Sequence, residues 1–253
     1  ARMTDLIRAP KMFPDNEVYL KTENLQNTGS FKLRGAYYKI SRLTDEQKAK
    51  GVIACSAGNH AQGVALAASR QGIDSLICLP EGAPISKVEA TRSYGARIEL
   101  VKGVYDDAYN RAVEIMKETG RTMIHPFDDE DVIAGQGSIG LEILQQLPDV
   151  DNIVVPIGGG GLIAGVAFTA KMLKPSVRIY GVQASGAASM FNSYEHHKIE
   201  ELCSVSTIAD GIAVKCPGSI TFPLVEKYVD DVVTVTDDEI AVAILDLMEK
   251  QKL

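Results

Sequence analysis

The sequence predicts an α/β protein of two lobes, each with a mostly parallel open sheet flanked by helices. Short apolar runs such as residues 52–55 and 75–79 alternate with helical patterns along the chain. These runs are almost continuously apolar, as strands covered by helices on both faces must be. The alternation forms two series, and residues 125–138, rich in acids and glycine, are predicted to cross between the lobes.

The first elements follow from capping patterns. Residues 18–21 are predicted to form a strand, and Ser30 is expected to N-cap a helix over 31–43. Thr44 and Gln47 have the spacing of a capping box, which begins another short helix.

The rest of the first series contains strands at 52–55, 75–79, 97–101 and 122–126 and helices at 61–71, 85–95 and 105–119. The second series contains a helix at 138–147, strands at 152–157 and 178–184, and a helix from about residue 162. It ends with a strand from residue 232 and a helix that begins at a capping box of Thr236 and Glu239. Strands that alternate with helices predict parallel pairing. The chain stops within its last helix without a C-terminal signal, which indicates a truncated C-terminus.

Composition and charge exclude several classes of function. The net charge is −7 and no Lys/Arg block is present, which argues against nucleic-acid binding. No apolar run has the length of a membrane span, and the first residues lack the apolar core of a signal peptide. The four cysteines are widely spaced without a C-x-x-C pair, so neither a disulfide framework nor a zinc site is expected. These features favour a cytoplasmic protein with no nucleic-acid or membrane partner.

The strongest chemical signal is a run of four glycines, Gly158, Gly159, Gly160 and Gly161, between an apolar strand and a helix that begins near Leu162. A tight strand-to-helix turn needs one or two glycines, whereas four leave the backbone N–H groups bare. Successive N–H groups beside a helix N-terminus form a cradle for phosphate.

The same glycines also allow a dinucleotide-binding module. Gly159, Gly161 and Ala164 fit G-x-G-x-x-A, but Gln183 stands where an acidic ribose partner is expected, and no Walker lysine follows. Neither NAD nor a nucleoside triphosphate therefore fits well.

A second signal is the loop of residues Ser56, Ala57, Gly58, Asn59 and His60, which follows the strand 52–55 and opens a helix. Hydroxyl, amide and backbone N–H groups at a helix N-terminus can bind a carboxylate. Each residue alone has an ordinary explanation as a cap, a turn or a helix histidine, so the cluster is more informative than its members.

Three motifs in the same order carry a resemblance: "TGSFKLRGA", "SAGNHAQG" and "GGGGLIAG". With the segments that link them, they resemble the threonine dehydratase and serine racemase branch of the fold type II pyridoxal-phosphate enzymes, which have a tryptophan synthase β-like fold. The resemblance implies a large lobe of residues 1–49 and 130–253 and a small mobile lobe of residues 50–129. It also implies pyridoxal 5'-phosphate as cofactor.

The resemblance assigns roles to single residues. Lys32 matches the lysine that holds the cofactor as a Schiff base, and Phe31 matches the aromatic residue against its ring. Asn59 matches the partner of the phenolic oxygen. The phosphate loop matches Gly158, Gly159, Gly160, Gly161 and Leu162, and Gly211 matches a backbone position near the ring. The loop of residues 56–60 is predicted, from its own polar groups at a helix N-terminus, to bind the substrate carboxylate.

The residue types agree with this chemistry. Burial of Lys32 between Phe31 and Leu33 is expected to lower its pKa and supply a neutral amine, which anchors the cofactor and then accepts the substrate Cα proton. Without the resemblance, a solvated helix lysine is the expected role of Lys32.

Two positions depart from the racemase pattern. Ala57 stands where that pattern has a serine that acts as base on the opposite face, so dehydration is favoured over racemisation. Gln183 and Ser189 replace two carboxylate ligands of a divalent metal, so no metal site is expected there. The family's hydroxyl partner of the pyridine nitrogen lies in a segment that these residues do not include.

The sequence therefore predicts a lyase that converts L-threonine to 2-oxobutanoate and ammonia, and L-serine to pyruvate, in a homo-oligomer such as a dimer or tetramer. The alternatives are serine dehydration or racemisation as the main activity, a truncated cofactor-binding chain without turnover, and the dinucleotide-binding module.

Overall fold

The computed structural model describes residues 1–253, which divide into two compact units. Unit 1 contains residues 1–2 and 23–136, and unit 2 contains residues 3–22 and 137–253. The division after Gln136 falls within the segment predicted to cross between lobes. Residues 23–49 group with unit 1 here, whereas the resemblance assigns them to the large lobe, and the limits and mobility of the lobes stay predictions.

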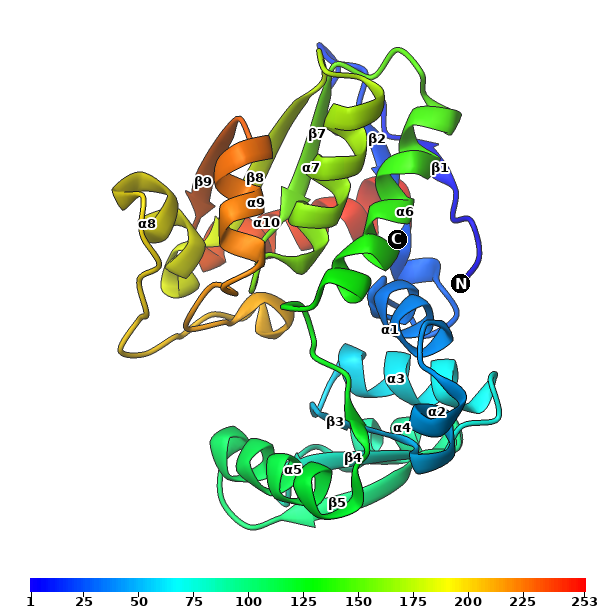
Figure 1. Cartoon of the computed structure of the whole chain (residues 1–253). Coiled ribbons are helices and arrows are strands. Elements are labelled where there is room, and N and C mark those ends of the chain that lie inside the picture. Colours follow the sequence, from blue (N-terminus) through cyan, green and yellow to red (C-terminus); the bar gives the residue numbers. More distant parts are fainter. The chain divides into compact units, whose positions relative to one another are not determined.

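Unit 1 consists of the short helix η1 (Glu23–Leu25), the helices α1 (Lys32–Ser41), α2 (Asp45–Lys50), α3 (Asn59–Ser69), α4 (Ile85–Ser93) and α5 (Tyr105–Thr119), the strands β3 (Val52–Cys55), β4 (Ser75–Pro80), β5 (Arg97–Val101) and β6 (Thr122–Met123), and the start of α6 (Glu130–Gln146). The strands form a parallel sheet in the order β5-β4-β3-β6. Figure 1 shows α3 and α5 on opposite faces of this sheet.

The side chains of β3 and β4 alternate between two cores. Val52, Ala54 and Ile77 belong to the larger cluster, which the apolar residues of α1 and α3 complete. Ile53 and Cys78 point to the other face and pack with Ala108, Ala112 and Ile115 of α5. This double coverage explains why both strands are apolar at nearly every position.

Unit 2 consists of the strands β1 (Leu6–Arg8), β2 (Tyr19–Lys21), β7 (Asn152–Pro156), β8 (Arg178–Ala184) and β9 (Asp231–Val235), the rest of α6, the helices α7 (Gly161–Leu173), α8 (Ser189–His196), α9 (Thr221–Tyr228) and α10 (Asp237–Asp246), and the short helices η2 (Ser185–Ala187), η3 (Asp210–Ile212) and η4 (Leu247–Gln251). β7, β8 and β9 form a parallel sheet in that order, while β1 and β2 pair antiparallel.

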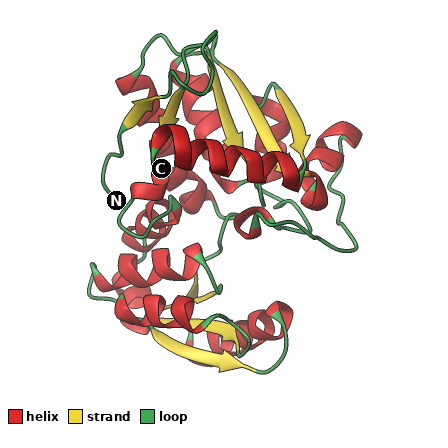
Figure 2. Cartoon of the chain, turned by 180° about the vertical axis from the view of Figure 1, so that it is seen from behind, coloured by secondary structure: helices red, strands yellow, loops and turns green.

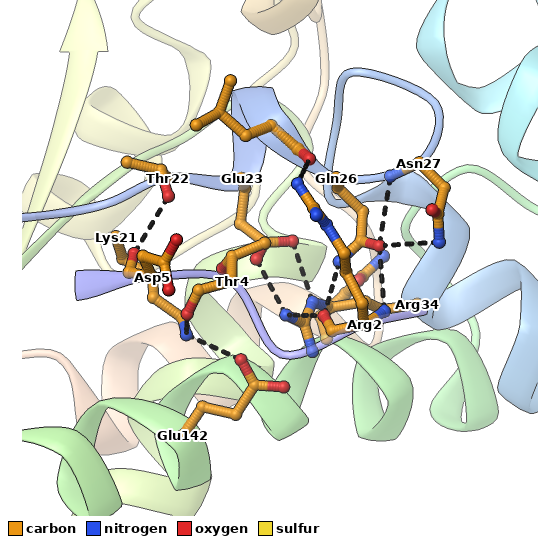
Figure 3. Close-up of polar contacts among 12 residues, drawn as sticks. Arg2, Thr4, Asp5, Lys21, Thr22, Glu23, Gln26, Asn27, Arg34 and Glu142 are labelled. Atoms are coloured by element: carbon orange, nitrogen blue, oxygen red, sulfur yellow. Dashed lines mark hydrogen bonds and ion pairs between the residues drawn. The ribbon is translucent and has the colours of Figure 1, made fainter. Parts of the chain in front are cut away.

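Helices lie on both faces of the sheet in unit 2. In Figure 1, α7 and α9 lie in front of the sheet, and Figure 2 shows α10 crossing the opposite face. The N-terminal strand pair is tied to α6, since Lys21 Nζ donates to Glu142 Oε2 at 2.6 Å (Figure 3). The same amine donates to Gln146 Oε1 at 2.9 Å. None of the helices is long and apolar enough to span a membrane.

Most predicted elements are present, including the capping boxes at Thr44 and Thr236. The expected cap at Ser30 is wrong, because Phe31 is the N-cap of α1 and no side chain caps that helix. The strand predicted over 122–126 ends at Met123.

The segment 125–138 is more helical than predicted, since α6 begins within it. The Asp129 carboxylate accepts hydrogen bonds from the N–H groups of Asp131 (2.9 Å) and Val132 (3.1 Å), which caps the first turn. Gly137 in this segment serves a helix contact rather than a loop, because a Cβ there would lie 3.1 Å from the carbonyl oxygen of Gly165 in α7.

Candidate functional site

Lys32 is the first residue of α1 and is half-buried. Its Nζ donates a hydrogen bond of 2.8 Å to the carbonyl oxygen of Pro126 and lies 5.3 Å from the centre of the Phe31 ring. Burial lowers the pKa of the Lys32 amine from 10.5 to about 8. At pH 7 about one such amine in ten is neutral, compared with about three in ten thousand at the ordinary value.

The backbone of Lys32 is fixed by close contact with α3. A Cβ on Gly63 would lie 2.9 Å from the Lys32 carbonyl carbon and 3.0 Å from the Leu33 nitrogen. Only a glycine lets α3 approach α1 this closely. The contact brings the start of α1 beside the helix that the 56–60 loop opens.

The middle of α1 is held by the first half of α6. A Cβ on Gly135 would lie 2.6 Å from Gly35 Cα and 2.7 Å from the carbonyl oxygen of Arg34. The N–H of Gly35 donates to Gln136 Oε1 at 3.3 Å, which adds a polar contact to this packing.

A buried ion pair anchors the first turn of α1. The Arg34 guanidinium donates to both carboxylate oxygens of Glu23, each at 2.8 Å, and these two side chains are 3% and 12% exposed (Figure 3). Arg34 also donates to the carbonyl oxygen of Arg2, which accepts a second hydrogen bond from Gln26 Nε2. These contacts restrain the helix that carries Lys32.

Two histidines of unit 1 interact electrostatically with Lys32. His60 is buried and its Nε2 lies 2.8 Å from the carbonyl oxygen of Ile124, to which it donates. Burial, followed by the charge of Lys32, lowers the pKa of His60 to about 3, so its ring stays neutral. His125 accepts the N–H of Asp128 at Nδ1 (2.7 Å), and burial likewise lowers its pKa.

The predicted substrate loop joins β3 to α3. The Ser56 hydroxyl accepts the N–H of Gly58 at 3.2 Å, and Asn59 is an exposed residue at the start of α3. No atom lies within 4 Å of the position that a Cβ on Gly58 would occupy. Ala57 packs at the edge of the large cluster of unit 1.

The glycine loop of unit 2 joins β7 to α7. Gly160 has a φ of +97°, and a Cβ there would lie 2.6 Å from Met190 Cε and 2.8 Å from Thr221 Oγ1. This position therefore requires glycine. The carbonyl oxygen of Gly159 accepts from Thr221 Oγ1 at 2.6 Å and from the N–H of Gly218 at 3.2 Å. Leu162 is the second residue of α7.

The structure brings the segment of Gly211 to this loop. Gly211 lies in η3, and the Cα of its neighbour Ile212 would be 3.2 Å from a Cβ on Gly158. No protein atom lies within 4 Å of a Cβ position on Gly211, so its own side is open.

The family model of pyridoxal-phosphate-dependent enzymes matches residues 1–253. The chain belongs to this family. It is 53% identical to the L-threonine ammonia-lyase of Thermotoga maritima over 237 residues, which cover 94% of this chain and 59% of that protein.

Two solved structures of family members are also similar. The processed form of threonine deaminase isoform 2 from Solanum lycopersicum has a TM-score of 0.98 and 42% identity, covering all of this chain and 70% of that one. Maize serine racemase has a TM-score of 0.97 and 40% identity, covering all of this chain and 77% of that one. The chain thus spans about three fifths to three quarters of the lengths of these family members.

The residues present fit the family's cofactor within each unit. Unit 1 supplies an amine of lowered pKa, and the hydroxyls of Thr28 and Ser30 close to it in sequence are buried without a hydrogen-bond partner. A buried hydroxyl without a partner is costly unless a ligand satisfies it. Unit 2 supplies a rigid cradle of glycines that side chains would fill.

The sequence missed three contributors to these sites. Pro126 accepts from Lys32 through its carbonyl oxygen, so its residue type gives no signal. His125 carries no motif signal in the sequence, yet its ring interacts with the charge of Lys32. Thr221 supports the glycine loop from 62 residues away, and only the fold brings it there.

Proposed function

We propose that this protein is a lyase that uses pyridoxal 5'-phosphate to convert L-threonine to 2-oxobutanoate and ammonia, and L-serine to pyruvate and ammonia. The observation that carries the proposal is the amine of Lys32, whose pKa falls to about 8 beside the Phe31 ring. The names of the threonine ammonia-lyase and threonine deaminase described above support the choice of substrate.

The residues of this chain divide the binding among them. Lys32 would hold the cofactor covalently through Nζ, with the Phe31 ring against the pyridine ring. Backbone N–H groups of the Gly158–Gly161 loop and of Leu162 would bind the phosphate. Asn59 would bind the phenolic oxygen, and Gly211 would leave room beside the ring. The loop from Ser56 to His60 would bind the substrate carboxylate at the positive end of α3.

Lys32 then has a second task. When bound, the cofactor provides a ring that accepts the negative charge developing at the substrate Cα. The Lys32 amine, when it is free, would accept the Cα proton. The hydroxyl on Cβ leaves as water after it gains a proton, and hydrolysis releases the 2-oxo acid and ammonia.

A second candidate function is serine racemisation, favoured by the likeness to maize serine racemase. Racemisation needs a group that returns a proton to the opposite face of Cα. The methyl group of Ala57 has no proton to exchange, so the loop argues for dehydration. An Ala57→Ser variant that gains D-serine formation would support this reasoning, while D-serine formation by the unaltered chain would establish the racemase alternative.

The decisive experiment follows cofactor attachment. The protein with added pyridoxal phosphate should absorb visible light, and borohydride reduction should fix the cofactor on the peptide that contains Lys32. Lys32→Ala should lose both signals, whereas Lys39→Ala in the same helix should keep them. A chain that takes up no pyridoxal phosphate would overturn the proposal.

We also propose that the protein works in the cytoplasm as a homo-oligomer, a dimer or tetramer. Light scattering coupled to size-exclusion chromatography measures the mass directly. A monomer at all concentrations would contradict the oligomeric part of the proposal.

A further inference from the structure

The hydrogen bonds of the glycine loop determine which way its peptide groups face. In a trans peptide the C=O of one residue and the N–H of the next point in opposite directions. The peptide bonds of the chain are all trans. Any contact that holds the Gly159 carbonyl therefore also directs the Gly160 N–H to the other side.

Two donors hold that carbonyl oxygen from the side of α9. The Thr221 hydroxyl donates to it at 2.6 Å, and the N–H of Gly218 donates at 3.2 Å. Thr221 is fully buried at the start of α9, and its Cβ would be 2.9 Å from a Cβ on Gly160. The loop therefore rests directly on this side chain.

The preceding peptide is held more weakly. Gln183, fully buried at the end of β8, donates from Nε2 to the carbonyl oxygen of Gly158 at 3.5 Å. Its Oε1 accepts the N–H of Phe191 at 2.8 Å, which fixes the amide orientation. Because 3.5 Å is at the limit of a hydrogen bond, Thr221 makes the stronger restraint.

None of these contacts uses the N–H groups of Gly159, Gly160 or Gly161 as donors. Because each held carbonyl points toward its donor, the N–H of the next residue points away from that donor: the Gly159 N–H away from Gln183, and the Gly160 N–H away from Thr221 and Gly218. Consecutive N–H groups oriented in this way form an anion-binding nest.

We propose that Thr221 is a positioning residue for the phosphate of the cofactor, acting through the peptide between Gly159 and Gly160. The inference rests on the proposed function, because it takes the bound anion to be the phosphate of pyridoxal phosphate. Thr221 itself touches the loop rather than the cofactor. Its hydroxyl keeps the Gly160 N–H aimed at the phosphate.

The test compares two variants and two ligands. Thr221→Val keeps the size of the side chain and removes the donor, while Thr221→Ser keeps the donor. The Gly218 N–H still satisfies the Gly159 carbonyl in Thr221→Val, so the variant is expected to fold. Pyridoxal has the aldehyde and ring of the cofactor but no phosphate, so it binds without the loop.

Thr221→Val should bind pyridoxal phosphate about ten-fold more weakly, the effect of losing one net hydrogen bond. Its affinity for pyridoxal should change less than about two-fold, and Thr221→Ser should bind both ligands like the unaltered protein. Thr91→Val is the matched control, because Thr91 is buried in unit 1 and its hydroxyl donates to the carbonyl oxygen of Lys87 at 2.9 Å. It should leave both affinities unchanged.

Equal weakening of pyridoxal phosphate and pyridoxal binding in Thr221→Val would overturn the inference. So would unchanged affinity of Thr221→Val for pyridoxal phosphate, or a loss of affinity in Thr221→Ser as large as that in Thr221→Val. If the unaltered protein takes up no pyridoxal phosphate, the proposed function fails while the inference is still tested with inorganic phosphate. Phosphorus NMR should then detect phosphate binding that Thr221→Val weakens and Thr91→Val does not. If inorganic phosphate does not bind, or binds equally well to the unaltered protein and to Thr221→Val, the role of Thr221 is rejected.

Discussion

The Lys32 amine donates its hydrogen bond to the carbonyl oxygen of Pro126, a neutral acceptor 2.8 Å away. A carbonyl satisfies a donor without supplying the full negative charge that would stabilise an ammonium ion. Desolvation is accordingly the cause of the lowered pKa of Lys32. This relationship separates Lys32 from Lys39 on the same helix, where Asp129 and Asp131 raise the pKa.

The rate of cofactor attachment should depend on the pKa of Lys32. Only the neutral amine attacks an aldehyde, so the rate should rise about ten-fold per pH unit below about pH 8 and level off above it. Stopped-flow absorbance with pyridoxal phosphate between pH 6 and 10 measures the profile. A rate that still rises steeply up to pH 10, as expected for an amine with the ordinary lysine pKa of 10.5, would show that burial does not activate this amine.

Gly63→Ala should destabilise the protein although it lies within a helix. An exposed Gly→Ala change in a helix stabilises by about 1 kcal/mol, but here the new methyl would meet the backbone of Lys32 at 2.9 Å. Overpacking of this kind costs about 1–3 kcal/mol and should also displace the Lys32 amine. Chemical denaturation and the cofactor absorbance spectrum measure both effects.

Gly82→Ala is the matched control for that change, because no atom lies within 4 Å of its Cβ position. It should leave the free energy of unfolding within about 0.5 kcal/mol of the unaltered value. A stabilised Gly63→Ala variant would contradict the close contact between α1 and α3.

His60 should make the protein sensitive to acid. Its folded pKa of about 3 lies below the ordinary 6.5, so below pH 6.5 the unfolded chain binds a proton that the folded chain does not. His60 therefore contributes stability above pH 6.5. As the pH is lowered from 6.5 to about 3, this contribution falls by up to about 1.4 kcal/mol per pH unit.

The measurement compares unfolding free energies across pH 3.5–7. His60→Gln keeps an Nε2 donor for the Ile124 carbonyl but cannot titrate, so its stability should fall less steeply with acid. His196→Gln changes an exposed histidine and should follow the unaltered protein. Equal slopes for all three proteins would exclude His60 as an acid-sensitive group.

Breaking the ion pair of Arg34 and Glu23 should be costly. Each side chain is at least 88% buried, so Arg34→Met or Glu23→Gln leaves its partner poorly compensated at a cost of about 3–5 kcal/mol. The exposed pair of Arg8 and Glu17 provides the control, because Arg8→Met should cost less than about 1 kcal/mol. Urea denaturation measures the free energy of unfolding of the three variants. Similarly small losses of stability in all three would mean that the buried pair contributes little to the stability of the fold.

The elements that the sequence predicted well are those with local signals. The capping boxes at Thr44 and Thr236 depend on residues three apart. The apolar runs of β3 and β4 follow from the burial of both faces of these strands under helices. The start of α6 was not predicted, because the acids and glycines near Gly135 suggested a crossing segment rather than a helix. In the fold these glycines allow close helix packing, which depends on a partner distant in sequence.

The site residues divide in the same way. Residue type and order indicated a polar loop and a phosphate cradle, whereas only the resemblance of the three motifs to a known family gave Lys32 its role. Thr221, the Pro126 carbonyl and the Gly63 contact could not be predicted, because their effects depend on distances of about 3 Å between segments far apart in the chain. The sequence by itself thus determined which chemical groups this protein has. Tertiary structure alone decided the burial that lowers the pKa of Lys32 and the hydrogen bonds that orient the glycine loop, since solvent exclusion and peptide orientation both require packed neighbours.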